Sequence, residues 1–353
     1  MAMTRWLALG LVLLLCGGAQ AGTVTLRPDH PNRYVVVKGD TLWGISARFL
    51  RDPWMWPEVW SVNPQIRNPH LIYPGDVIVL SYVNGKPQLR LGRAAAGATT
   101  APAGERTVAL HPEVRREPLP KAIPTIPMSA ILPFLTRPDV VAKGELKAAP
   151  YVVEIANEHL VGASGSRIYV RRLTDPAHRR YAVVREGGVY RNPKTQEILG
   201  YEAIHLADAT LITPGDPATL RLTRVNQEVL TGDRLVPLTD QRVEENFTPH
   251  APKQPVDGQI ISVFHGVSQI GQDQVVVLDV GRRDGVRVGD VLAIYQTGAR
   301  IRDTVEGGLG KTVQLPDERA GLLMVFRPFE RVSYALVMSA TRAIHLDDTV
   351  RNP

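Results

Sequence analysis

Apolar residues in the N-terminal part of the chain follow two different periods. Residues 34–37 and 77–80 are short β-branched runs, which are typical of strands. Between these runs, Leu42, Ile45 and Phe49 are spaced three and four residues apart, so they share one face of a helix of about residues 41–49. The pattern therefore predicts a strand, then a helix, and later a second strand.

Two further signals mark the helix ends in this stretch. Asp40 stands immediately before the first helix, where a carboxylate can accept hydrogen bonds from the first N–H groups, and we expect it to be the N-cap. A second helix, over about residues 57–62, begins with proline in its first turn and stops at Asn63-Pro64. The order strand, helix, helix, strand predicts a small α+β module over residues 34–81.

Beyond residue 150 the pattern changes to short apolar runs separated by Gly, Asp and Pro, which is typical of strands joined by turns. Many short strands at this spacing favour small barrels or sandwiches. The fold class we predict is therefore α+β: a βααβ module followed by a mainly-β body, with 151–238 and 258–353 forming either two domains or one intertwined body. The predicted strands are 151–155, 167–170, 181–184, 219–222, 260–264, 274–278, 291–295, 320–326 and 334–338.

Composition marks where these units begin and end. Residues 92–104 contain almost no large apolar side chain, so they cannot form a core and are expected to be a flexible tether. Apolar residues return between Ile126 and Leu135, where we predict a docking helix that ends before Pro138. The predicted domains are a signal peptide (1–21), the N-terminal module (34–81), a flexible Ala/Pro-rich linker (82–120), a β-rich middle domain (121–245) and a β-rich C-terminal domain (256–353).

One short phrase recurs along the chain: an apolar residue shortly before Gly-Asp, then one residue and another apolar residue. It occurs in 37–42, 72–78, 229–235 and 286–292. Its physical content is a tight turn in which Gly takes a positive φ and Asp bonds the backbone, ahead of a strand or helix. We interpret the phrase as shared turn chemistry rather than a true repeat.

The N-terminus has the features of a secretory signal peptide. Arg5 precedes the apolar run Trp6–Leu15, and small residues follow up to Ala21, after which we expect cleavage. The run is too short for a transmembrane helix, and no later segment approaches that length. Cys16, the single cysteine, is expected to be part of this apolar segment; the alternative, a lipid-anchored cysteine, is disfavoured by Leu15 before it. We expect an exported, soluble mature chain without a thiol.

Charge narrows the class of partner. The formal net charge is +6, and 40 basic against 35 acidic residues remain once Arg5 is removed. The sequence pI near 9.5 suits a polyanionic neighbourhood such as the cell wall. No basic cluster is interleaved with stacking aromatics, so we expect no nucleic-acid partner.

The N-terminal module contains several short motifs in a fixed order. They are Tyr34-Val35-Val36, Gly39-Asp40-Thr41-Leu42-Trp43, Ile45, Asn63, Asn68-Pro69, Leu71-Ile72-Tyr73-Pro74-Gly75-Asp76 and Val77-Ile78. In this order they resemble the LysM module, a small glycan-binding domain. The sequence departs from the usual LysM pattern in a longer connection between the helices, Leu50–Trp56. The resemblance implies that a glycan lies in a shallow groove between two loops, 39–42 and 68–74.

The resemblance also implies which residues bind the glycan. N-acetylated sugars carry amides, which pair with backbone N–H and C=O groups, and methyl groups, which need an apolar floor. We expect Leu42, Ile72, Tyr73 and Pro74 to form that floor, while Gly39 lets the backbone approach closely. Helix capping is the competing role of Asp40, and core packing is the competing role of Ile72. The predicted glycan-binding residues are Gly39, Asp40, Thr41, Leu42, Asn68, Pro69, Leu71, Ile72, Tyr73 and Pro74.

All tryptophans of the mature chain fall in this module. Trp54 and Trp56 lie in the longer connection and are candidates for stacking on sugar rings. Trp43 and Trp60 are expected to pack between the helices, because a module of this size needs large apolar side chains to form a core.

Exported proteins with such a module are often wall hydrolases, which makes catalytic signatures relevant. The absence of a thiol from the mature chain excludes cysteine peptidases, and no Ser is followed three residues later by Lys. The nine histidines form no H-x-H or H-E-x-x-H pair for zinc. Residues 308–312 hint at a P-loop, but its leading position is Val305. A glycosidase built on two carboxylates leaves no short motif and stays open. We expect no catalytic residue, metal site or cofactor.

The C-terminal part carries a second set of motifs. They are Ser268-Gln269-Ile270-Gly271-Gln272, residues 285–292, residues 320–327, residues 329–338, Asp348 and Pro353, together with residues 52–57 of the module. They resemble the type IV pilus secretin-associated LysM proteins, whose C-terminal part is similar to a flagellar ring protein domain. The resemblance implies a scaffold in which LysM holds peptidoglycan while the β-rich half binds or surrounds the outer-membrane secretin.

We therefore predict a non-enzymatic periplasmic protein associated with the cell wall and the secretin. Its expected partners are peptidoglycan and the outer-membrane secretin of type IV pili, and a ring of copies around the secretin would add avidity to a weak single module. Two alternatives stay open. One is a wall-remodelling hydrolase or regulator targeted by LysM, and the other is a wall-bound adaptor for another envelope complex.

Overall fold

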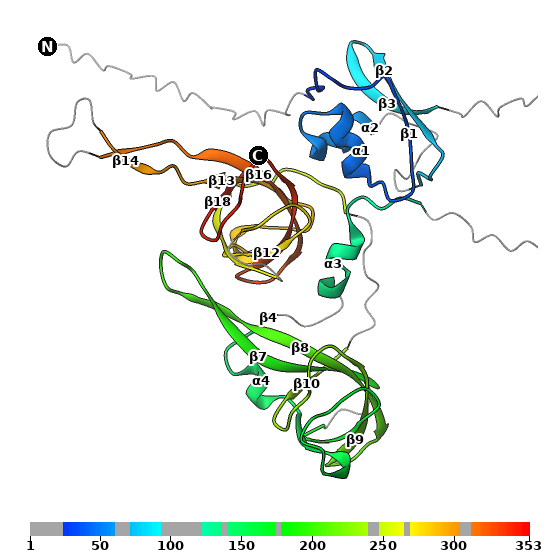
Figure 1. The fold of residues 1–353 in the computed structure, drawn as a ribbon, viewed down its shortest axis with the longest axis vertical. Coiled ribbons are helices and arrows are strands. Elements are labelled where there is room, and N and C mark those ends of the chain that lie inside the picture. Colours follow the sequence, from blue (N-terminus) through cyan, green and yellow to red (C-terminus); the bar gives the residue numbers. More distant parts are fainter. Residues whose placement is uncertain are drawn as a thin grey trace, which may run out of the picture.

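The computed structural model arranges the described residues in three folded parts (Figure 1). An N-terminal module is drawn blue and cyan, a middle β-rich part green, and a C-terminal barrel yellow to red. The predicted signal peptide, most of the predicted linker, and Asn68 and Pro69 fall outside the described residues. The described residues are 24–60, 71–92, 122–135, 140–173, 178–238, 247–264, 269–303 and 312–353.

The N-terminal module is a three-stranded antiparallel sheet, in the order β1-β2-β3, packed against two helices. The predicted first helix and both predicted strands are confirmed, and the second helix begins at Trp56. Ile45 and Phe49, which share a face of the first helix, are buried with Trp56 and Ile78 in one core. The elements are β1 (Arg33–Val35), α1 (Leu42–Phe49), the 3-10 turn η1 (Pro53–Met55), α2 (Trp56–Trp60), β2 (Val77–Val83) and β3 (Lys86–Gly92).

Two expectations for this module are wrong. The N-cap of α1 is Thr41, whose hydroxyl accepts a hydrogen bond from Gly44 N, because Asp40 is already bonded within the preceding turn. Strand β3 lies in the stretch that we assigned to the flexible linker, and it pairs with β2 along its whole length. The module therefore includes β3, whose last residue is Gly92.

A short segment connects the module to the rest of the chain. Residues 122–127, which we call the strap, lead into α3 (Met128–Leu135), and Figure 1 shows this helix beside the barrel and below the module. Phe134 on α3 packs against Phe264 and Tyr334, with ring centroids 4.7 and 6.1 Å apart. The predicted docking helix is confirmed, and it docks on the C-terminal barrel.

The middle sheet has seven antiparallel strands in the order β4-β8-β7-β10-β5-β6-β9. Because β8 also pairs with β9, the six strands from β8 to β9 form a closed ring of pairings. The four strands predicted here are confirmed as β5, β6, β7 and β9, whereas β8, the longest strand, was not predicted. The elements are β4 (Val140–Val141), α4 (Glu145–Ala148), β5 (Tyr151–Ile155), the 3-10 turn η2 (Ala156–Glu158), β6 (Arg167–Arg171), β7 (Arg180–Arg191), β8 (Ile198–Thr213), β9 (Ala218–Val225) and β10 (Arg234–Pro237).

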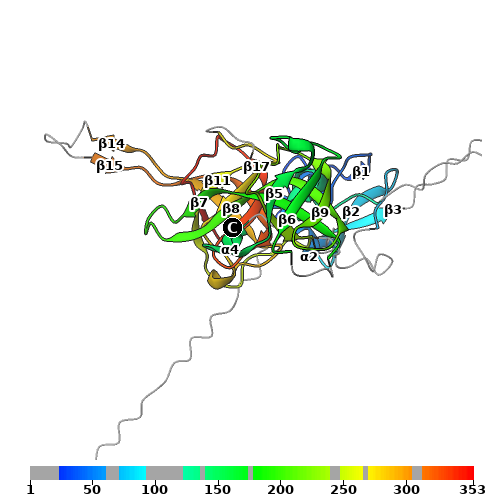
Figure 2. The same ribbon diagram turned by 90° about the horizontal axis from the view of Figure 1, so that it is seen from below.

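The C-terminal barrel is closed, in the strand order β11-β12-β17-β16-β13-β18. All five strands predicted here are confirmed. A separate two-stranded hairpin, β14–β15, projects from the barrel in both ribbon views (Figures 1 and 2), and we call it the arm. The elements are β11 (Asp257–Val263), β12 (Val275–Leu278), the 3-10 turn η3 (Arg282–Asp284), β13 (Val291–Gln296), β14 (Arg300–Arg302), β15 (Thr312–Gln314), β16 (Glu318–Pro328), β17 (Ser333–Ala340) and β18 (Thr349–Arg351).

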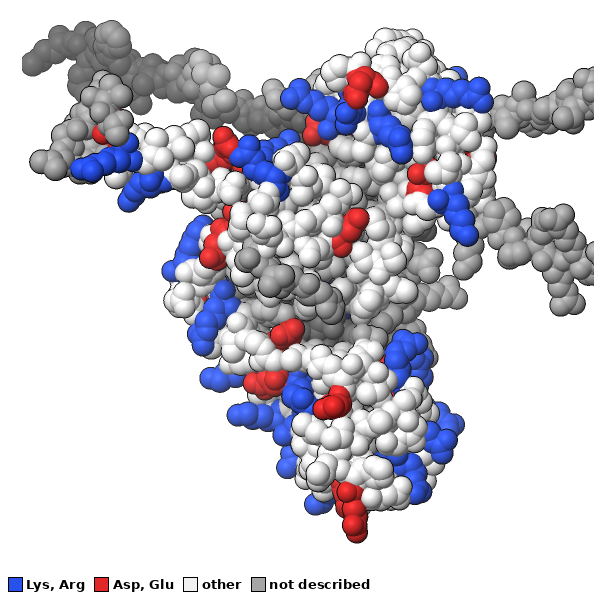
Figure 3. All heavy atoms as spheres, viewed as in Figure 1, with Lys and Arg blue, Asp and Glu red and all other residues white. Residues whose placement is uncertain are grey.

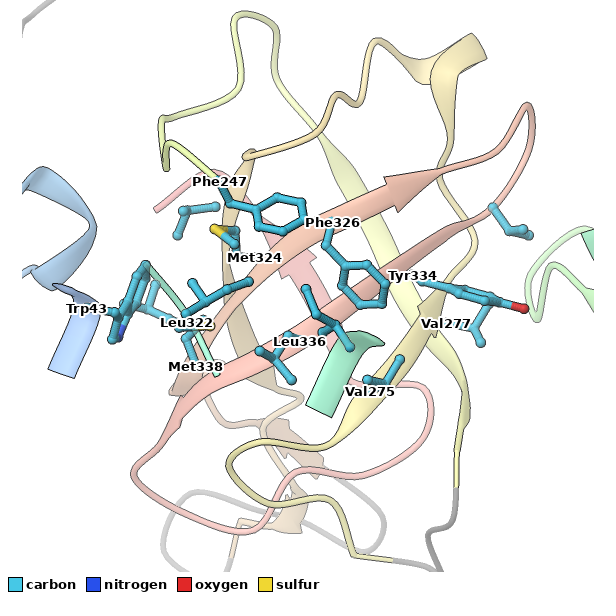
Figure 4. Close-up of a cluster of buried hydrophobic side chains, with 14 of the residues drawn as sticks. Trp43, Phe247, Val275, Val277, Leu322, Met324, Phe326, Tyr334, Leu336 and Met338 are labelled. Atoms are coloured by element: carbon cyan, nitrogen blue, oxygen red, sulfur yellow. The ribbon is translucent and has the colours of Figure 1, made fainter. Parts of the chain in front are cut away.

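Both other parts contact the barrel. Figure 4 shows Trp43 of the module beside Leu322 and Met338 of the barrel, in a cluster that also contains Ile126 and Ile131. The polar contacts join the β7–β8 turn to the barrel: Glu197 bonds Arg283 at 2.9 Å and Arg331 at 3.2 Å, and Asn192 donates to Asp279 at 2.8 Å. The parts therefore pack on one another through both apolar and charged contacts.

Charged side chains of both signs are scattered over the visible face, most of which consists of other residues (Figure 3). Basic groups are spread over the middle sheet and the arm, with acidic groups between them. Within the described ranges, no helix combines the length and apolarity needed to cross a membrane.

Candidate functional site

The first loop of the expected groove is a tight turn ahead of α1. Gly39 has a φ of +98°, a conformation that glycine adopts without strain. The Asp40 carboxylate accepts hydrogen bonds from Val37 N at 2.8 Å and from the Tyr34 hydroxyl at 3.0 Å. Burial raises the pKa of Tyr34, and the hydrogen bond to Asp40 raises it further. Asp40 therefore holds the turn together.

The second loop repeats this chemistry. Gly75 has a φ of +99°, and the Asp76 carboxylate accepts a hydrogen bond from Tyr73 N at 2.8 Å. Backbone hydrogen bonds of 2.8 Å join this loop to Val36, one from Gly75 N to Val36 O and one from Val36 N to Asp76 O. The two loops are thus fixed side by side.

The same turn occurs in the other two parts. Asp233 accepts from Leu230 N at 2.7 Å, and Asp290 accepts from Arg287 N at 2.7 Å, each with a positive-φ glycine before the aspartate. Each aspartate is followed at once by a strand, β10 and β13 respectively. The interpretation of the recurring phrase as shared turn chemistry is confirmed.

Hydrogen-bond donors and an acceptor of the backbone line the groove between the loops. The first N–H groups of a helix have no partner within the helix. In α1, Gly44 N and Ile45 N bond to Thr41, whereas the N–H groups of Leu42 and Trp43 bond outside the module. On the facing loop, the carbonyl of Ile72 also accepts a bond from outside the module. The described residues of the two loops therefore present two donors and one acceptor.

The strap supplies all three partners. Leu42 N donates to the Pro124 carbonyl at 3.0 Å, and Trp43 N donates to the Thr125 carbonyl at 3.1 Å. From the strap, Ile123 N donates to the Ile72 carbonyl at 2.8 Å. Residues 123–125 thus bridge the two loops through three main-chain hydrogen bonds.

The apolar floor of the groove lies under the strap. Leu42 and Ile72, two of the expected floor residues, are 2% and 0% exposed and belong to the core cluster of the module. Ile123 of the strap, 5% exposed, is a member of the same cluster. Tyr73 is half-buried and Pro74 is exposed, so they form the rim rather than the floor.

The remaining expected site residues are dispersed around this groove. Gly39 and Leu71 are exposed, and Thr41 is half-buried as the N-cap of α1. Asn68 and Pro69 lie outside the described residues. The main-chain role of Trp43 and the presence of the strap were not predicted, and no periodic or compositional signal in 122–127 indicates either of them.

The tryptophans divide differently from expectation. Trp60 is buried in the module core as expected, and Trp56, a candidate for sugar stacking, is buried there too. Trp54 packs partly buried against the module core and the barrel cluster. Trp43, expected between the helices, instead joins the barrel cluster. The tryptophans therefore build the core and the contact with the barrel.

A second hollow, of about 620 Å³, lies between the middle sheet and the barrel. Its lining includes Tyr201 and Lys143 on one side and Arg282, Phe329 and Arg331 on the other. In the described part of the chain, no group of three or more His, Cys, Asp or Glu side chains is placed to hold a metal ion.

Comparisons with known proteins agree with the geometry of the module. Residues 34–81 match the LysM domain family. A stretch of 55 residues is 40% identical to "Uncharacterized protein YqbP" of Bacillus subtilis (strain 168), covering 13% of this chain and 25% of that protein. The chain thus spans about a quarter of the length of this curated relative. The N-terminal module is a LysM domain, followed by a mostly-β body, and this domain supports binding to peptidoglycan or a related carbohydrate.

Proposed function

We propose that this chain is a non-enzymatic scaffold of the periplasm that binds peptidoglycan through its LysM domain. The observation that carries the proposal is the LysM match at residues 34–81. The N–H donors of Leu42 and Trp43 and the carbonyl of Ile72 support it. An acetamido group has one C=O acceptor and one N–H donor, so it can pair with both sides of this groove. The signal-like residues 1–21 support export.

We further propose that the β-rich body binds or surrounds the outer-membrane secretin of the type IV pilus machinery. The support is the resemblance of residues 285–292 and 320–338 to the type IV pilus secretin-associated LysM proteins. Both stretches run through strands and turns of the C-terminal barrel. A wall anchor raises the local concentration of the body next to its partner, and a ring of copies around the secretin adds avidity to the weak binding of a single LysM domain.

Sedimentation with purified sacculi tests the glycan part. Mature full-length protein is expected to pellet with sacculi and to be released by soluble oligomers of N-acetylglucosamine. Tyr73→Ala, at the rim of the groove, is expected to weaken pelleting about threefold to tenfold, the cost of one lost apolar contact. Tyr82→Ala is the matched control, because Tyr82 is 60% exposed on β2 of the same module. Equal loss from both variants would argue against binding in this groove.

Affinity purification from an envelope extract tests the partner. With full-length protein as bait, the secretin is expected among the retained proteins, and sacculi incubated with the pure protein are expected to stay intact. Release of soluble sugar fragments would favour the alternative of a wall hydrolase. Retention of a different envelope complex without the secretin would favour the adaptor alternative.

A further inference from the structure

The strap lies where the LysM groove is expected to receive its ligand. It bridges both loops with three main-chain hydrogen bonds, of 2.8, 3.0 and 3.1 Å, and it places Ile123 on the apolar floor beside Leu42 and Ile72. A carbonyl, an N–H and an aliphatic group are the same three chemical features that an N-acetylated sugar offers. The strap therefore satisfies the N–H groups of Leu42 and Trp43 and the carbonyl of Ile72, the three main-chain groups that the described loop residues direct outside the module.

We propose that the strap is an internal competitor that closes the glycan groove of this chain. The inference rests on the proposed glycan-binding function and adds its regulation. A glycan strand gains access only when residues 123–125 leave the groove. Glycan binding and strap docking are thus mutually exclusive, and the open fraction of the strap scales the apparent affinity for glycan.

The sequence of the strap suits this role. Pro124 and Pro127 each fix a backbone dihedral and restrict the preceding residue to extended conformations. The strap therefore loses less conformational entropy on docking than an ordinary loop. Because it is part of the same chain, it also competes at a high effective concentration.

The strap connects the groove to the barrel. Ile123 is buried in the module core, whereas Ile126, three residues later, is buried in the cluster that includes Trp43 and barrel residues. The Trp43 side chain faces the barrel, while its N–H holds the strap. Opening the groove therefore disturbs one side of the contact between the LysM domain and the barrel, which couples glycan binding to the position of the body.

The affinity of full-length mature protein for a short oligomer of N-acetylglucosamine tests whether the strap competes with glycan for the groove. Ile123→Ser removes the apolar anchor of the strap and is expected to tighten binding about tenfold or more. Ile123→Val keeps most of the anchor and is expected to tighten binding by only about twofold to threefold. Circular dichroism and thermal melting check that both variants fold.

Hydrogen exchange of the wild-type protein gives a readout that needs no variant. On saturation with the oligomer, the amide of Ile123 is expected to exchange faster because it loses the Ile72 carbonyl. The amides of Leu42 and Trp43 are expected to stay protected because the sugar replaces the strap. Equal affinity of wild type and Ile123→Ser, or an Ile123 amide that stays protected at saturation, overturns the strap inference and leaves glycan binding standing. If neither protein binds the oligomer or sacculi, the proposed function and the inference both fall.

Discussion

Tight turns at single residues decide where several elements of this protein begin. In the barrel, one such turn has Gly289 at a φ of +92° and another has Asp347 at +68°, each followed by an aspartate that accepts a main-chain N–H. The surroundings differ: a Cβ at position 289 would lie 2.3 Å from the Thr248 carbonyl oxygen, whereas Asp347 is exposed. Position 289 therefore requires glycine, whereas position 347 tolerates a residue with a side chain.

Substitutions at these two positions are expected to act in opposite directions. Gly289→Ala combines a positive φ with a clash against main chain, and we expect it to lower the free energy of unfolding by roughly 3 kcal/mol. Asp347→Gly relieves the left-handed conformation and is expected to be neutral or stabilising by up to about 1 kcal/mol. Urea denaturation of the two variants measures both effects, and similar losses in the two would show that the turn geometry does not decide stability.

His250 predicts a pH dependence at the same turn. Its Nδ1 lies 3.0 Å from Oδ1 of the buried Asp290, and this carboxylate raises the pKa of His250 above the usual 6.5. A histidine pKa that is higher in the folded than in the unfolded state adds to the free energy of unfolding. This contribution is fully present below pH 6.5 and is lost as the pH rises through the pKa of the folded state. The Tm advantage of wild type over His250→Gln is expected to be larger at pH 5.5 than at pH 8.5. An advantage that does not change with pH would exclude this ion pair as its source.

At the level of elements, the docking of α3 depends on one face of the helix. Phe134 contacts three aromatic rings, those of Phe264, Phe326 and Tyr334, and its main-chain carbonyl accepts a hydrogen bond from Arg327. Leu132, on the same helix, is 49% exposed. The two residues thus form a matched pair for measuring how strongly α3 is held.

Phe134→Ala is expected to weaken the docking of α3 by about 2 kcal/mol, less than for a fully buried ring because Phe134 is half-buried. Leu132→Ala is expected to change it by less than about 0.5 kcal/mol. Amide hydrogen exchange in residues 128–135 measures both. If the two variants exchange alike, the aromatic contacts do not hold the helix.

Sequence patterns correctly predicted the helices and strands that are specified by residues close together in the chain. The face shared by Leu42, Ile45 and Phe49 and the β-branched strand runs were confirmed because each depends only on neighbouring residues. Strand β8 was missed because Glu202, Ala203 and Ala207 are residues that strands disfavour, and register shifts along β7 and β8 break the alternation of buried positions. The N-cap was misassigned by one residue because Asp40 serves its own turn.

The groove, too, could be predicted only in part from local sequence patterns. Its loops were expected from the motifs of residues 39–42 and 71–74, yet the strap lies about fifty positions further on, in a segment without periodicity. Its three hydrogen bonds to the loops are made by main-chain groups, which every residue type carries. A single isoleucine, Ile123, supplies the apolar contact with the module core, and one apolar residue forms no pattern. Only the folded chain brings Ile123 onto Ile72.

At the scale of the whole molecule, the LysM domain is attached to the barrel by noncovalent contacts as well as by the polypeptide chain. Trp43 packs into the barrel cluster, Asp52 lies 3.7 Å from Arg319, and the strap spans both parts. The tether that we expected over residues 92–104 is therefore not the sole link between the LysM domain and the described part of the body. We expect these contacts to hold the LysM domain on the barrel even when the chain between the two is cut.

A specific protease site inserted between residues 93 and 121 permits that test. After cleavage, the LysM fragment is expected to co-elute with the rest of the chain in gel filtration, because the strap remains on the body fragment and still docks into the groove. Ile123→Ser is expected to promote separation of the fragments, as is an excess of N-acetylglucosamine oligomer. Complete separation of the cleaved wild-type protein would show that these contacts are too weak to hold the domain.

Closure of the two β-rich rings leaves few strand edges in the described part of the chain. Main-chain groups of an open edge can recruit strands from neighbouring molecules, which leads to aggregation. Here the edges that remain belong to the LysM sheet, to the two-residue strand β4 and to the arm, where Ile301 and Val313 are exposed. A body built this way can be crowded at high local concentration and still remain a set of separate molecules.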